Sequence, residues 1–159
     1  MKFNLTLKLK SLSATETKHY GELFSKALSG RDLVVLVGAL GGGKTTFTKG
    51  ILKGLGYRGR VLSPSFTLVR EYLTKKFKTY HVDLYRLDKN EALNLGLDDF
   101  IYSDNSLTLI EWGDRIDKEL DKYIVVKFSY LAESSRQLLI STVGYNKQKI
   151  KAIKGLINK

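Results

Sequence analysis

The sequence contains no cysteine, a single proline and no long apolar run in its 159 residues. Without cysteine the protein has no disulfide bond and no thiolate-ligated metal, which suits a reducing cytosol. No apolar stretch approaches the length of a membrane-spanning helix, and the N-terminus lacks the apolar core of a signal peptide. With 43% hydrophobic residues and no low-complexity segment, the composition predicts an ordered globular protein in the cytoplasm.

Acidic residues are scarce outside one segment. The net charge is +11, and eleven of the sixteen acidic residues lie between Asp83 and Asp121. The stretch from Asn146 to Lys159 holds five lysines and no acid. Such a surface attracts nucleic acid or an acidic partner protein, but no RNA-binding sequence signature accompanies it. We therefore favour the solvated face of a helix for this stretch.

The most specific pattern is a glycine-rich loop of the form G-x-x-x-x-G-K-T at Gly38–Thr45. It follows the apolar run Leu33–Val37 and precedes the helical pattern Thr46–Lys53, which is the context that a phosphate-binding loop requires. The glycines allow backbone N–H groups to point at phosphate oxygens, and the following helix adds partial positive charge. Lys44 can reach the terminal phosphates, and the Thr45 hydroxyl can ligate Mg²⁺. The loop predicts nucleotide binding.

The rest of the chain predicts one α/β domain over residues 1–159, with a P-loop NTPase-like three-layer fold and a mainly parallel central sheet. No internal repeat or linker divides the sequence. Strand patterns include one from Phe3 to Leu9, an interrupted one from Val61 to Tyr72, and an antiparallel C-terminal hairpin. The hairpin joins Tyr123–Tyr130 to Gln137–Val143. Ser13 with Glu16 and Asp88 with Glu91 predict two capping boxes. A last amphipathic helix has Ile150, Ile153, Leu156 and Ile157 on one face.

A phosphate loop requires an acidic residue from a neighbouring strand end to complete its magnesium site. Glu111 follows the apolar run Leu107–Ile110, so we expect it at the carboxyl end of a strand and favour it as the metal-side acid. Asp83 alternates with His81 in a strand pattern. It could bond the Thr45 hydroxyl, bond a magnesium-bound water, or orient the attacking water. Its role stays open.

Three features near these acids are less specific. A single histidine without placed partners predicts little, so we expect a structural role for His81. Trp112 suits either core packing or a stacking surface. The hydroxyl-rich turn Ser63–Thr67 could close over the γ-phosphate as a switch, or be an ordinary loop before a strand.

In their order along the chain, these motifs resemble the bacterial tRNA threonylcarbamoyladenosine biosynthesis ATPase family, called TsaE or YjeE. The phosphate loop is generic, whereas the His-x-Asp-Leu-Tyr-Arg-Leu and Glu-Trp elements at these spacings are far more specific. The matching stretches span most of the chain up to about Arg115. They are Gly38–Phe47, Ser63–Val69, His81–Leu87, Gly96–Phe100 and Glu111–Ile116.

The resemblance implies a magnesium-dependent ATPase that supports a TsaD-like transferase and a TsaB-like partner protein. That assembly places a threonylcarbamoyl group on the adenosine next to the anticodon in tRNAs that read ANN codons. Contact of this chain with the tRNA could be direct or indirect. The resemblance also implies site residues. Catalysis is assigned to Lys44, Asp83 and Glu111, magnesium binding to Thr45 and Glu111, and ATP or ADP binding to Gly41, Gly42, Gly43, Lys44, Thr45, Thr46 and Arg136.

Two positions depart from the family pattern. The family often has aspartate where this chain has Ala39, and its switch element usually reads Ser-Pro-Thr, whereas Ser65 stands third here. Ala39 occupies a variable loop position, so we expect phosphate binding to survive. Ser65 keeps the hydroxyl but lacks the methyl group, which predicts a looser loop. The basic C-terminal helix lies outside the resemblance.

Three other functions share the phosphate loop. A nucleotide-gated adaptor would use the same binding residues, so the sequence does not separate it from an ATPase. A small P-loop kinase would need an acceptor pocket and an arginine-rich lid, and a GTPase would need an Asn-Lys-x-Asp segment; neither pattern is visible. We expect slow hydrolysis by the isolated chain, because no arginine finger is evident.

Overall fold

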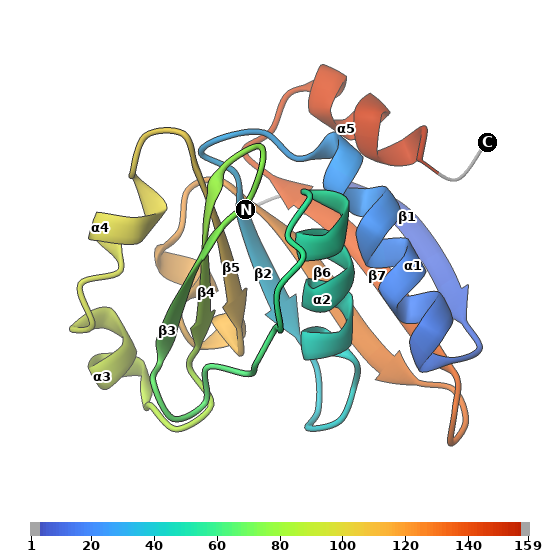
Figure 1. Cartoon of the computed structure of the whole chain (residues 1–159), viewed down its shortest axis with the longest axis horizontal. Coiled ribbons are helices and arrows are strands. Elements are labelled where there is room, and N and C mark those ends of the chain that lie inside the picture. Colours follow the sequence, from blue (N-terminus) through green and yellow to red (C-terminus); the bar gives the residue numbers. More distant parts are fainter. Residues whose placement is uncertain (1–3, 157–159) are drawn as a thin grey trace.

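The computed structural model of the chain describes residues 4–156, in which strands and helices alternate along most of the sequence (Figure 1). Phe3, Ile157 and Lys159, to which the sequence patterns extend, lie outside the described residues. The strands are β1 (Asn4–Ser11), β2 (Leu33–Val37), β3 (Val69–Leu73), β4 (Lys78–Asp83), β5 (Ser106–Glu111), β6 (Tyr123–Tyr130) and β7 (Arg136–Val143). The α-helices are α1 (Ala14–Phe24), α2 (Lys44–Gly54), α3 (Lys89–Leu93), α4 (Asp98–Ile101) and α5 (Lys147–Lys154), and the 3₁₀ helices are η1 (Ser25–Ala27), η2 (Gly113–Arg115) and η3 (Asp117–Glu119).

Within residues 4–156 the strands form one mixed seven-stranded sheet, in the order β1-β7-β6-β2-β5-β4-β3. The central strands are parallel: β2 pairs with β5 and β6, and β4 pairs with β5. The outer pairs β1–β7, β6–β7 and β3–β4 are antiparallel. The predicted α/β fold and the antiparallel C-terminal hairpin are confirmed, with the parallel strands confined to the centre of the sheet.

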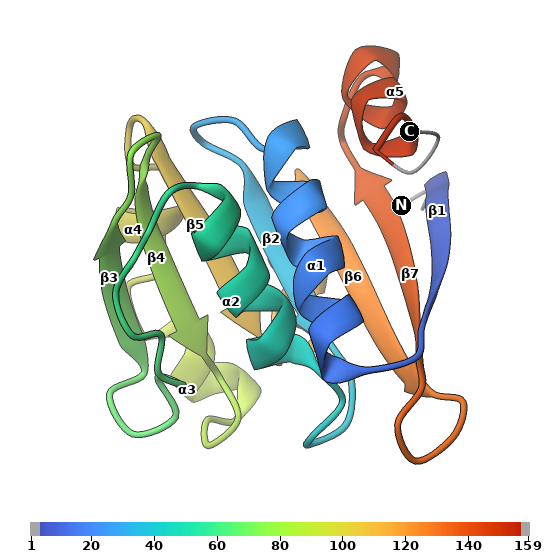
Figure 2. The same cartoon turned by 45° about the vertical axis from the view of Figure 1, so that its right-hand side comes forward.

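Helices cover both faces of this sheet, which gives the predicted three layers. Figure 2 shows α1 and α2 side by side over one face. A hydrophobic cluster on that face joins Phe24, Phe47 and Ile51 to the strands and includes Ile153 of α5. A second cluster, with Val82 among its strand residues, packs beneath α3, α4 and the segment that contains η2 and η3. None of the helices in the described part of the chain has the length and apolar character needed to cross a membrane.

Both predicted capping residues lie at helix starts, but only the pair at α3 forms a full capping box. The Ser13 hydroxyl accepts a hydrogen bond from the Glu16 N–H at 3.1 Å at the start of α1, whereas the Glu16 carboxylate accepts from the N–H of Leu12 and not of Ser13. Asp88 and Glu91 cap α3 reciprocally, each side chain accepting from the other residue's backbone N–H. These short-range signals depend only on local spacing, which is why the sequence locates them.

Strand β3 begins at Val69, later than the strand pattern from Val61 predicts. The carbonyl of Pro64 accepts hydrogen bonds from the N–H groups of Thr67 and Leu68 and closes a turn. Leu68 then adopts a φ of 62°, in the left-handed region that a strand does not tolerate. The segment before Val69 is therefore a loop, and it lies over the carboxyl end of the sheet.

Helices α1 and α2 cross in backbone contact because a glycine lies on each of them at the crossing. A Cβ on Gly50 would lie 2.0 Å from the Lys18 carbonyl oxygen, and one on Gly21 would lie 2.2 Å from that of Phe47. The aromatic rings of Phe24 and Phe47 pack next to the crossing, with their centroids 5.5 Å apart. The helix that carries the phosphate loop is thus fixed closely against α1.

Replacing Gly50 by alanine is expected to lower the free energy of unfolding by about 1–3 kcal/mol, because the new methyl group forces the two helices apart. Urea unfolding followed by circular dichroism measures this change. Gly155→Ala is the matched control, since the φ of Gly155 is −70° and an added Cβ would lie 3.4 Å from the Lys151 carbonyl oxygen, an ordinary van der Waals contact. Equal stability of the Gly50 variant and the parent chain would contradict the close packing of α1 and α2.

Candidate functional site

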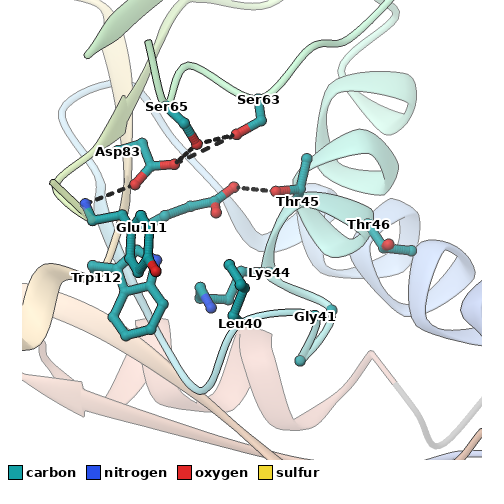
Figure 3. A pocket seen from close by; sticks show the side chains of 13 residues that line it. Leu40, Gly41, Lys44, Thr45, Thr46, Ser63, Ser65, Asp83, Glu111 and Trp112 are labelled. Atoms are coloured by element: carbon teal, nitrogen blue, oxygen red, sulfur yellow. Dashed lines mark hydrogen bonds between the residues drawn. The ribbon is translucent and has the colours of Figure 1, made fainter.

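The candidate site lies where the central parallel strands end. Strand β2 leads into the glycine loop, β4 ends at Asp83 and β5 ends at Glu111. Asp83 and Glu111 are directly opposite in the β4–β5 register. Figure 3 shows the side chains of these elements converging on one cavity. The cavity has a volume of about 160 Å³ and is lined by Leu40, Gly41, Gly42, Gly43, Lys44, Thr45, Thr46, Ser63, Ser65, Asp83, Tyr85, Glu111 and Trp112.

The glycine loop has the conformation that its residue types predict. Gly41 and Gly43 have φ values of 72° and 109°, a region that residues with a Cβ rarely adopt. Helix α2 begins directly after Gly43, so its unpaired N–H groups lie beside the cavity. The C-terminal hairpin supports the loop from outside, because the Tyr130 hydroxyl donates to the Leu40 carbonyl at 2.9 Å. Loop and helix start together present an electropositive wall.

Lys44 is nearly buried, with 4% of its surface exposed. Its ammonium group donates to the carbonyls of Gly38 at 2.6 Å and Ala39 at 2.9 Å, and it lies 4.3 Å from the centroid of the Trp112 ring. Burial lowers the pKa of Lys44, and the nearby carboxylates of Glu111 and Asp83 act in the opposite direction. Since Ala39 contributes only its carbonyl, this contact does not require the aspartate that the family often has there.

Glu111 contacts both a predicted partner and an unpredicted one. Its Oε1 atom accepts hydrogen bonds from the Thr45 hydroxyl and from His81 Nε2, each at 2.8 Å. Among residues 4–156, no group donates to Oε2. Glu111 also lines the cavity. The two residues predicted to ligate magnesium are therefore in direct contact.

The contact that His81 makes with the site was not predicted from the sequence. His81 is fully buried, and its Nδ1 atom has no hydrogen-bond partner among the described residues. Because an ionised carboxylate only accepts, Nε2 carries the proton that bonds Glu111. His81 thus holds the orientation of the Glu111 carboxylate. The only sequence signal was its alternation with Asp83, which places both side chains on the face of β4 that Glu111 shares from β5.

Asp83 binds the loop before β3. Its Oδ2 atom accepts from the hydroxyls of Ser65 at 2.7 Å and Ser63 at 3.4 Å, while Oδ1 accepts from the Tyr85 N–H at 2.9 Å. The Thr45 hydroxyl, one of the partners considered for Asp83, donates to Glu111 instead. Asp83 therefore connects the hydroxyl-rich turn to the sheet, and Figure 3 shows this group of hydrogen bonds above Lys44.

Trp112 lines the cavity and also packs against the second hydrophobic cluster, so it combines the two roles that the sequence left open. It is half-buried, and its φ of 59° turns the chain sharply after β5. Its ring packs on Tyr85, with the centroids 5.0 Å apart, and on the ammonium group of Lys44. The Trp112 ring, supported by Tyr85, therefore lies against the Lys44 ammonium group as a cation–π contact.

Arg136 is separate from the other predicted site residues. Its guanidinium donates to the carbonyls of its own turn and reaches the Gly41 carbonyl at 3.5 Å. It lines a smaller neighbouring cavity of about 70 Å³ together with Ser13, Ala14, Thr17, Gly41, Gly43, Thr46 and Ser134. The structure thus gathers the loop residues, Asp83 and Glu111 in one cavity and leaves Arg136 on the other side of the loop.

The donor set of the main cavity fits a hard divalent cation. Asp83 and Glu111 are buried side by side, an arrangement that is costly for two carboxylates unless positive charge lies near them. A carboxylate and a hydroxyl are oxygen ligands of the kind that Mg²⁺ prefers. Residues 4–156 contain no cluster of three His, Cys, Asp or Glu side chains able to hold a metal ion. Mg²⁺ typically uses few protein ligands and takes the rest from water and phosphate.

Comparisons with known proteins agree with one another. The model of the family described as "Threonylcarbamoyl adenosine biosynthesis protein TsaE" matches residues 11–138. The tRNA threonylcarbamoyladenosine biosynthesis protein TsaE of Bacillus subtilis is 36% identical over 141 residues, which cover 87% of each chain. The protein of the same name from Haemophilus influenzae is 39% identical over 140 residues, covering 85% of this chain and 87% of that one.

A solved structure extends the likeness to the whole fold. The structure titled "Crystal structure of Bacillus subtilus YdiB" superposes with a TM-score of 0.82 at 28% identity, covering 99% of this chain and 97% of that one. The family match includes the glycine loop, Asp83, Glu111 and most residues of both hydrophobic clusters. This chain therefore belongs to the TsaE family, whose members take part in tRNA threonylcarbamoyladenosine biosynthesis.

Proposed function

We propose that this chain is the magnesium-dependent ATPase of the tRNA threonylcarbamoyladenosine machinery, and that it supports a TsaD-like transferase and a TsaB-like partner. The main support is the contact of Thr45 with Glu111 beside the buried Lys44 ammonium group. Lys44 offers a cation for the terminal phosphates, and Thr45 and Glu111 offer oxygen ligands for the metal. All three side chains meet at the N-terminus of α2. Family membership supplies the tRNA-modification context.

ATP binds in this proposal with its phosphates along the main cavity. The backbone N–H groups of Gly41 to Thr46 surround the phosphates, and Lys44 exchanges its bonds to the Gly38 and Ala39 carbonyls for bonds to phosphate oxygens. Arg136 lines a cavity that shares Gly41, Gly43 and Thr46 with the main one. We therefore assign Arg136 to the part of the nucleotide beyond the phosphates.

Hydrolysis requires water to attack the γ-phosphorus as the bond to the β–γ bridging oxygen breaks, which gives ADP, phosphate and a proton. Mg²⁺, when held by Thr45 and Glu111, supplies charge neutralisation at the β- and γ-phosphates. Lys44 stabilises the negative charge that develops on the transferred group. Asp83 accepts hydrogen bonds at the edge of the same cavity, where it can orient the attacking water. His81 keeps the Glu111 carboxylate in place throughout.

The cavity also gives a reason for slow turnover by the isolated chain. The part of the chain that the structure describes contributes no arginine to its lining. Arginine fingers supply a large share of catalysis in related phosphoryl transfers, so a partner that inserted one would accelerate hydrolysis. The same feature supports the alternative of a nucleotide-gated adaptor, which binds ATP to dock on its partners without turnover.

Single-turnover hydrolysis separates the two functions. Trace γ-labelled ATP is mixed with excess chain, with and without the TsaD-like and TsaB-like partners, and phosphate release is followed. The ATPase proposal expects slow release by the chain alone and a large acceleration with the partners. Partner binding that follows the nucleotide state, with no phosphate released in either mixture, would establish the adaptor instead.

A further inference from the structure

A second cavity lies away from the nucleotide site and is strongly basic. It has a volume of about 410 Å³ and lies between α1, α2 and the loop after α2. Five of the residues that line it are cations, and Tyr57, Gly59 and Val61 complete the wall. We refer to it as the basic cavity, defined by Lys18, Lys49, Lys53, Arg58 and Arg60.

The fold brings these cations together from three segments. Lys49 and Lys53 are four residues apart on α2, so they share one face of the helix. The backbone contact at Gly50 then places Lys18 of α1 beside that face. Arg58 and Arg60 follow on the loop that leaves α2. The positive charge is therefore concentrated by the close crossing of two helices, and not by a run of lysines in the sequence.

Most of this charge is not neutralised within the protein. Lys53 donates to Glu22 at 2.9 Å, and a side-chain hydrogen bond from Lys53 lowers the pKa of Glu22. The other four cations of the basic cavity make no ion pair with any of residues 4–156. All five are exposed. Like charges held this close repel one another, so a polyanion that occupies the cavity relieves that repulsion.

The chemistry of the wall favours a phosphate backbone. The planar guanidinium groups of Arg58 and Arg60 match phosphate oxygens with paired hydrogen bonds, and the lysines add point charges. The Tyr57 ring packs edge-on against Tyr72, with centroids 5.0 Å apart, which fixes an aromatic group beside the cations. Aromatic rings among cations are typical of sites that bind RNA, because an unpaired base can stack on the ring.

From these observations we infer that the basic cavity is a direct contact site for the sugar-phosphate backbone of tRNA. The choice of tRNA as the nucleic acid rests on family membership in tRNA modification. The inference goes beyond the proposed ATPase function and does not depend on ATP hydrolysis. It also differs from the sequence expectation, which placed basic charge on α5, because the cavity is lined by none of the α5 lysines.

The test compares two triple variants that remove the same number of charges from the full chain. The cavity variant is Lys49→Ala, Arg58→Ala, Arg60→Ala, and the matched control is Lys147→Ala, Lys151→Ala, Lys154→Ala on exposed positions of α5. Binding of a fluorescein-labelled unmodified tRNA that reads an ANN codon is followed by anisotropy at several salt concentrations. We expect the cavity variant to bind about tenfold or more weakly, and the slope of log affinity against log salt to fall by about 2. The control should change affinity by less than about threefold.

Each outcome decides the inference. If both variants bind tRNA equally weakly, RNA binding depends on overall charge and the inference is overturned. If the cavity variant keeps full affinity for tRNA, the inference is also overturned. Loss of binding to an acidic protein partner by a cavity variant that keeps its tRNA affinity would assign the cavity to that partner instead. Melting curves and ATP titration of both variants confirm that the fold and the nucleotide site are intact. Because Lys49, Arg58 and Arg60 do not line the nucleotide cavity, a failure of the ATPase proposal appears in the ATP titration and leaves the RNA result unaffected.

Discussion

Alanine in place of Lys44 is expected to reduce ATP hydrolysis by about 100-fold or more and to abolish measurable ATP and ADP binding. Lys44 provides the one ammonium group among the lining residues of the nucleotide cavity that the structure describes. Without it, the carboxylates of Asp83 and Glu111 face the phosphates with less compensating charge. In cells, tRNA should lose its threonylcarbamoyl adenosine.

Calorimetric titration with ATP and Mg²⁺ measures the Lys44 effect directly, and mass spectrometry of digested tRNA measures the cellular one. Lys151→Ala is the matched control, because Lys151 lies on α5, is exposed and lines neither the nucleotide cavity nor the basic cavity. A melting curve for each variant excludes loss of fold. Normal tRNA modification in cells that carry only the Lys44 variant would refute the proposed function.

Glutamine in place of Glu111 is expected to slow hydrolysis by about 100-fold and to remove most of the magnesium dependence of ATP binding. The substitution keeps the shape of the side chain and an oxygen for Thr45 and His81, but it removes the charge. Thr45 and His81 both donate to Oε1, so the Oε2 position is the free one for a metal ligand. An amide nitrogen there cannot serve this purpose.

ATP affinity measured with and without Mg²⁺ provides the readout for Glu111→Gln. The parent chain should bind far more tightly with Mg²⁺, whereas the variant should bind almost equally in both conditions. Glu119→Gln serves as the control, because Glu119 is half-exposed and pairs with Lys89 away from the cavity. A Glu111 variant that kept the full magnesium response would remove Glu111 from the metal site and shift that role to Asp83.

The sequence predicted the parts of the molecule that depend on local spacing. The glycine loop, the capping residues Ser13 and Asp88, and the hairpin of β6 and β7 all follow from neighbouring residue types. The placement of Glu111 at a strand end also followed, because an apolar run precedes it. Thr45 and Glu111 could be paired on chemical grounds before their contact was seen.

Contacts that depend on the order of the strands in the sheet could not be predicted from the sequence. His81 reaches Glu111 only because β4 and β5 are parallel neighbours, and nothing in either strand specifies that pairing. The late start of β3 depends on the left-handed Leu68, a residue type that seldom adopts this conformation. The basic cavity arises from a helix crossing, so its cations are dispersed along the sequence and show no charge run.

The outermost strands of the sheet have a consequence for the behaviour of the molecule at high concentration. Strand β1 presents the exposed lysines Lys8 and Lys10 and has an irregular register between Leu5 and Leu7, while β3 at the opposite margin has only five residues. Open β-edges are templates for aggregation, and charged, irregular or short strands oppose it. Two copies paired along β1 would bring their lysines together, so edge-to-edge association of the sheet is disfavoured.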